Sequence, residues 1–60
     1  MNVKSEMAIK RFERASDIIN EILQGACERG HTTWLEEIRL KGLSQQRIDA
    51  MFEIAYWEGL

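Results

Sequence analysis

Apolar residues recur at alternating intervals of four and three residues along the first half of the chain. The positions that keep this spacing are Ala8, Phe12, Ala15, Ile19, Ile22 and Ala26. Such spacing is typical of a helix that packs lengthwise against other helices. No proline interrupts it, because the chain contains none. We therefore predict a long helix over residues 5–29 that ends before Gly30. Its packing seam contains Phe12, Ile19 and Ile22.

Two sequence signals bound a second, shorter helix. Thr33 is followed three residues later by Glu36, which matches a capping box in which each side chain accepts the backbone N–H of the other residue. Gly42 can adopt the left-handed conformation that ends many helices. These signals predict a helix over residues 34–41, followed by a tight turn that carries Ser44.

The last part of the chain predicts a third helix, over residues 45–58, with apolar side chains on two opposite sides. One stripe contains Ile48, Met51, Phe52 and Ala55, and the other contains Ala50, Ile54 and Trp57. A chain of this size can cover only one of them. We expect the first two helices to cover the Ile48 stripe, which leaves the Ala50 stripe for a partner.

These elements predict an all-α fold with a single domain over residues 1–60. A long N-terminal helix is expected to carry two shorter helices folded back on it. A chain of this size buries only about 60% of the surface that its unfolded form exposes, so its stability is marginal. Cys27 is the only cysteine, which excludes an internal disulfide as reinforcement. We therefore expect two copies to pair into a dimeric helical bundle.

Charge and cysteine usage favour a soluble, cytoplasmic protein. The net charge is −2, and the basic residues are too sparse for the dense patch that nucleic-acid or membrane binding usually requires. The N-terminal segment has no apolar run of the kind found in a secretory signal or a membrane span. One unpaired thiol is typical of a reducing compartment.

Catalysis and metal binding find little support in the sequence. Cys27 and His31 are four residues apart, a spacing that suits two metal ligands on one helical face, but Gly30 ends the helix between them. The chain has one histidine, no glycine loop for a nucleotide and no recognisable pair of catalytic carboxylates. We expect no enzymatic activity, no metal and no cofactor.

The surplus apolar stripe favours a protein-binding function. Trp and Tyr are over-represented where binding energy concentrates at protein interfaces. The expected partner or dimer surface contains Ala50, Ile54, Tyr56 and Trp57, with Leu60 at its edge. We expect the chain to act as a stoichiometric regulator of a larger protein, as an inhibitor, antagonist or adaptor. Small chains encoded by bacteria and their phages often act in this way.

The turn expected around Gly42 leaves open an alternative function, that of a small helix-turn-helix transcription regulator. Gln45, Gln46 and Arg47 would then lie at the start of a recognition helix, where such side chains reach base edges. Asp49, on the same helix, would repel phosphate. We therefore place DNA binding below protein binding.

Overall fold

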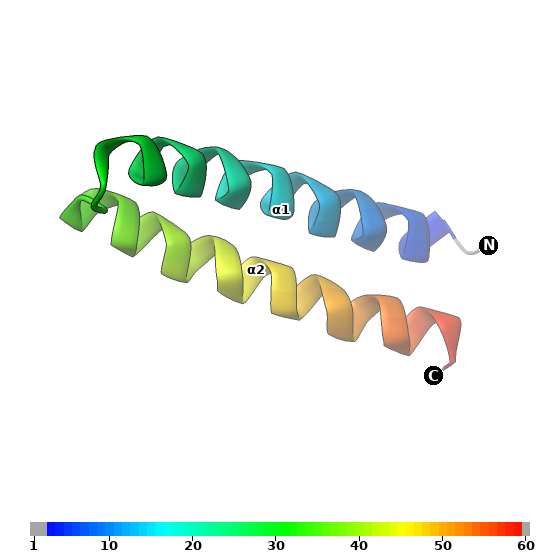
Figure 1. Ribbon diagram of the computed structural model, residues 1–60. Coiled ribbons are helices and arrows are strands. Elements are labelled where there is room, and N and C mark those ends of the chain that lie inside the picture. The colour runs from blue at the N-terminus through cyan, green and yellow to red at the C-terminus, as the bar shows by residue number, and fades with distance from the viewer. Residues whose placement is uncertain (1–2, 60) are drawn as a thin grey trace.

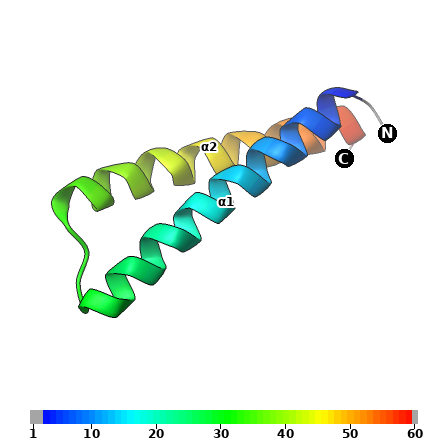
Figure 2. The ribbon, with the colours of Figure 1, turned by 90° about the horizontal axis from the view of Figure 1, so that it is seen from above.

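The computed structural model describes residues 3–59, which form two helices, α1 (Val3–Arg29) and α2 (Trp34–Glu58). The helices run antiparallel and are joined by a short connection, so both ends of the chain lie at the same end of a rod of 41 × 15 × 14 Å (Figure 1). Seen from above, the two helices cross at an angle and diverge toward the connection (Figure 2). The all-α class is as predicted from the sequence.

The connection between the helices has the local structure that the sequence predicts. Gly30 has φ 86°, and its N–H donates to the Ala26 carbonyl at 2.8 Å. The capping box is confirmed, because the Glu36 N–H donates to Thr33 Oγ1 at 3.2 Å and the Thr33 N–H donates to Glu36 Oε1 at 2.9 Å. The turn that reverses the chain is therefore fixed by local hydrogen bonds.

The predicted break at Gly42 is wrong. α2 continues from Trp34 to Glu58 without interruption, in place of the two helices expected over residues 34–41 and 45–58. Among the described residues, positive φ angles occur at Gly30 and Gly59, and Gly42 is helical. A glycine inside a helix costs up to about 1 kcal/mol relative to alanine. The continuous helix packs against α1 through residues on both sides of Gly42, from Leu40 to Trp57.

Both helices contribute a row of residues to the contact between them, which we call the inner seam. On α1 the buried positions are Ser5, Ala8, Ala15, Ile19, Ile22 and Ala26, and Phe12 is half-buried among them. On α2 Ala50 is buried, and Leu40, Leu43, Arg47, Ile54 and Trp57 are half-buried. Each row alternates steps of three and four residues, which is the spacing of two helices packed lengthwise.

The two apolar sides of the last segment exist as predicted, but their roles are reversed. Ala50, Ile54 and Trp57 belong to the inner seam and face α1. Phe52, which we expected to be covered, is 72% exposed. The physical reason is the continuity of α2, because Leu40 and Leu43 extend the Ala50 row into one seam that a break at Gly42 would have divided.

Ion pairs between described residues tie the two helices together at the connection and closer to the open end of the hairpin. Arg29 of α1 pairs with Glu36 at the start of α2, and Arg11 pairs with Glu53. The Arg29 hydrogen bond, with the Thr33 backbone N–H as the second contribution, lowers the pKa of the Glu36 carboxyl to about 2. Within residues 3–59, neither helix carries an apolar stretch long enough for a bilayer crossing.

Candidate functional site

The side of α2 that faces away from α1 carries a second row of residues, which we call the outer stripe. It consists of Trp34, Ile38, Lys41, Gln45, Ile48, Phe52 and Ala55. The steps are again four and three residues, so these side chains share one face of the helix, opposite the inner seam. At 1.5 Å per residue this row is about 32 Å long.

Large apolar groups of the outer stripe are open to solvent. Trp34 and Phe52 are each 72% exposed, Ile38 is 50% exposed and Ile48 is 44% exposed. By contrast, Ile19 and Ile22 are the large side chains classed as buried among the described residues. Scattered exposed apolar residues are ordinary, but several large ones on one face of a helix often mark an interaction site.

Further apolar side chains widen the outer stripe along both edges. Leu35 is 65% exposed, Met51 is 53% exposed and Tyr56 is 73% exposed. Aromatic residues and methionine are enriched in protein interfaces, where flexible or flat side chains fit a partner surface. The row and its edges therefore form a surface suited to another helix.

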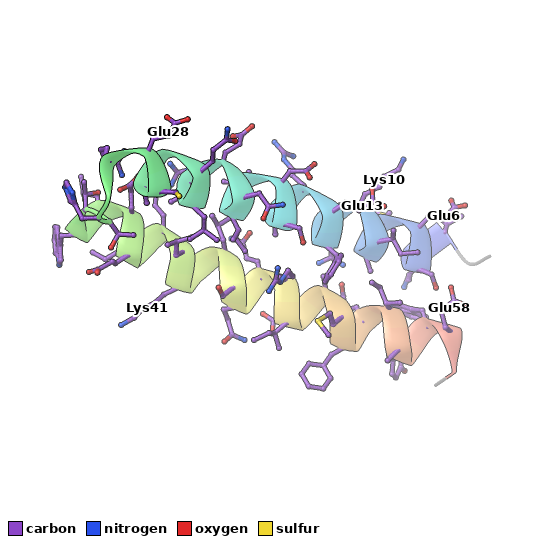
Figure 3. All side chains as sticks on the ribbon, viewed as in Figure 1. Glu6, Lys10, Glu13, Glu28, Lys41 and Glu58 are labelled. Atoms are coloured by element: carbon purple, nitrogen blue, oxygen red, sulfur yellow. The ribbon has the colours of Figure 1, made fainter. Side chains whose placement is uncertain are left out.

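Polar groups occupy the middle of the outer stripe, between its two apolar ends. Figure 3 shows Lys41 on the side of α2 that points away from α1. One turn further along, the Gln45 Nε2 group donates to Asp49 Oδ1 at 2.9 Å. The order along the stripe is thus apolar, polar, apolar.

Of the predicted partner residues that the structure describes, Tyr56 alone is mainly exposed. Ala50 is 1% exposed and faces α1, so it does not reach a partner of the folded hairpin. Ile54 and Trp57 are half-buried in the inner seam, with the Lys4 ammonium 4.5 Å from the centre of the Trp57 ring. The Tyr56 and Trp57 rings pack edge to face, with their centroids 4.9 Å apart. Leu60 lies outside the described residues.

The residues predicted as alternative DNA contacts do not form the start of a recognition helix. They lie in the middle of α2, and the turn that the alternative requires is absent. Arg47 turns toward α1, with its guanidinium carbon 6.0 Å from the centre of the Phe12 ring. Gln45 and Gln46 are exposed, but Gln45 lies on the outer stripe and Gln46 lines a shallow hollow beside Arg14. The helix-turn-helix geometry is therefore not formed.

Cys27 and His31 are both exposed and lie on different elements, because α1 ends before His31. Among residues 3–59, no group of three or more His, Cys, Asp or Glu side chains is placed to hold a metal ion.

Sequence reasoning missed Trp34 and Ile38 as members of an exposed apolar row, and it placed Phe52 and Ile48 in the core. The signal that identifies all four is the unbroken four-and-three spacing from Trp34 to Ala55. It becomes visible only when the helix is allowed to continue through Gly42.

Comparison of the chain with known protein families, curated proteins and solved structures gives no significant match.

Proposed function

We propose that this protein is a helical protein-interaction module, which acts by binding rather than by catalysis, and that the outer stripe of α2 is its binding surface. The observation that carries the proposal is the row of large apolar side chains that the hairpin leaves open, from Trp34 to Phe52. Burying such groups is the main driving force of protein association.

The shape of the surface favours a helical partner. Apolar groups at intervals of four and three residues insert into the grooves of another helix. In this role the protein forms a homodimer and regulates a larger protein stoichiometrically, as an inhibitor, antagonist or adaptor, in the cytoplasm. Regulation follows from occupancy, because a bound outer stripe covers whatever helix of the target it contacts.

Matched substitutions test this function. The wild-type chain, Phe52→Glu and Leu23→Glu would each be immobilised and exposed to a lysate of the host that encodes the chain. Leu23 is a suitable control because it is 47% exposed but lies on α1, away from the outer stripe. Proteins retained by the wild type would be identified by mass spectrometry, purified and titrated against all three chains.

The expected result is a purified target that binds the wild type and Leu23→Glu alike and loses at least tenfold in affinity for Phe52→Glu, since a charge would be buried in the contact. Equal binding of the target to all three chains would contradict the assignment of the surface.

A further inference from the structure

The outer stripe raises the question of what covers it, and its residue order points to one occupant. We infer that a second copy of this chain binds there, with the two α2 helices antiparallel and Gln45 of each copy at the two-fold axis. This inference rests on the proposed function, since it concerns the same surface, for which the second copy and a helix of the target then compete.

Two pairs of large apolar residues lie at equal distances on either side of Gln45, although the outer stripe itself steps four residues back to Lys41 and three residues on to Ile48. In an antiparallel pair with its axis at this position, two residues lie level when their numbers add to 90. Ile38 then lies level with Phe52 of the other copy, and Trp34 with Tyr56 of the other copy. Apolar ends therefore meet apolar ends, and Gln45 meets its own copy, while Ile48 lies level with Gly42 of the other copy.

Charge complementarity selects the antiparallel direction. The same register brings Lys41 level with Asp49 of the other copy, on both sides of the axis. A parallel pair would instead place the two Lys41 ammonium groups against each other. Within one chain Lys41 and Asp49 are about 12 Å apart along the helix, so neither neutralises the other, and Asp49 lines a hollow together with Arg11 and Arg14 of α1. Opposite charges at facing positions commonly set the direction of helix pairing.

The Gln45 side chain suits the axis. Each amide has both a donor and an acceptor, so two Gln45 side chains can hydrogen-bond to each other across the axis. A polar residue inside an apolar seam fixes the register of paired helices, because any shift leaves it without a partner. Its present hydrogen bond to Asp49 uses only one of its donors.

Pairing of two copies would also add buried surface to a hairpin that has a small core of its own. Its buried residues among those described are mostly alanine and serine. A stable dimer buries about 800 Å² on each partner, which is about one sixth of the 4781 Å² that this chain exposes. In the pair, α2 is covered by α1 on one side and by its copy on the other. A helix with apolar groups on opposite sides is normally buried in this way.

The first test measures association of the wild-type chain by sedimentation equilibrium. We expect a dimer that dissociates on dilution. A chain that stays monomeric at concentrations up to about 1 mM would overturn the inference. If Phe52→Glu still loses its target in that case, the proposed function stands without the second copy.

Charge reversal tests the register without altering the apolar contacts. Lys41→Glu would place a glutamate level with Asp49 of the other copy on both sides of the axis, so that two attractions become two repulsions. We therefore expect dimer affinity to fall roughly tenfold. Combining it with Asp49→Lys should restore most of the loss. Absence of rescue would overturn the pairing of these residues, and the matched change Gln24→Glu on the outer side of α1 should have no effect.

Disulfide trapping tests the direction. In a Cys27→Ser background, mild oxidation should link two copies of Gln45→Cys, because only at the axis are identical residues close enough for a disulfide. Lys41→Cys and Gln24→Cys should remain unlinked. Efficient linking of Lys41→Cys with itself would show a parallel pair and overturn the inference.

Discussion

The outer side of α1 and the outer side of α2 have the same geometry but opposite chemistry. Each is the face turned away from the inner seam. On α1 this face carries Glu6, Lys10, Glu13, Asp17, Asn20, Gln24 and Cys27, and Figure 3 shows the first three pointing away from α2. On α2 the corresponding face is the outer stripe, with Trp34, Ile38, Ile48 and Phe52.

This difference separates α1, whose outer face is polar, from α2, whose outer face carries large apolar residues. α1 buries one face and presents charge to water on the other, as a helix at the surface of a bundle does. α2 has its larger exposed groups on the face that α1 does not cover, while the residue it buries best is Ala50. The hairpin thus buries mostly small residues and leaves large apolar ones exposed.

A charge introduced on each side of α2 gives the largest expected difference between its two faces. Ala50→Glu buries an unpaired carboxylate against α1, and we expect it to cost about 3 kcal/mol or more and to unfold the hairpin. Phe52→Glu changes only the outer stripe, so its loss of stability should disappear on dilution. Circular dichroism at several protein concentrations distinguishes the two effects. Equal loss of helix at every concentration would contradict the assignment of the faces.

Two neighbouring residues of α1, one buried and one exposed, test the position of the inner seam on that helix. Ile22 is 8% exposed in the inner seam, whereas Leu23 is 47% exposed. Ile22→Ala should lower the free energy of unfolding by about 2–4 kcal/mol, because it opens a cavity between the helices. Leu23→Ala should cost less than about 1 kcal/mol. Urea denaturation of both variants gives the two values, and the opposite ranking would be incompatible with this seam.

Two glycine substitutions test whether α2 is one helix, on which the outer stripe depends. A Cβ at Gly42 would have no atom within 4 Å, so Gly42→Ala should stabilise the fold by roughly 0.5–1 kcal/mol. Gly30→Ala should destabilise it by about 1 kcal/mol, because φ is 86° there. Thermal melts of the two variants should move in opposite directions. Destabilisation by both would favour a turn at Gly42.

The smallest expected effect concerns the ion pair at the connection. The pKa of Glu36 is lowered to about 2, so its contribution to stability is present above the unfolded pKa of about 4.3 and is lost as the pH falls toward 2. Glu36→Gln keeps the capping box but removes the charge. The stability of the wild type should exceed that of Glu36→Gln above about pH 5, and the two should converge in acid. Parallel curves down to pH 2 would contradict the role of Arg29.

Local signals made much of the fold predictable. The first helix, Gly30 after its end and the capping box of Thr33 and Glu36 each depend on residues close in sequence, and the structure has all three. The inner seam of α1 also followed from spacing alone, since Ile19 and Ile22 are buried there.

The course of α2 was not predictable in the same way. Gly42, Leu43 and Ser44 are residues that often form a turn between helices, and nothing local opposes that reading. What opposes it is packing against α1 by residues on both sides of Gly42, from Leu40 to Trp57. Because the expected break divided both rows of α2, the shorter Ile48 stripe looked like the better core. The Ala50 side was consequently predicted to be exposed, whereas it faces α1.

The central claim is that Phe52 faces outward and is covered only by a second molecule, while Ala50 faces α1. In a Cys27→Ser background, Ala50→Cys and Phe52→Cys each introduce one thiol, whose rate of reaction with a disulfide reagent reports its exposure. In dilute solution the thiol from Phe52→Cys should react roughly ten times faster, or more, than the thiol from Ala50→Cys. The rate of the Phe52→Cys thiol should fall as the protein concentration rises. Faster reaction of the thiol from Ala50→Cys, or a Phe52→Cys rate that does not depend on concentration, would contradict the account.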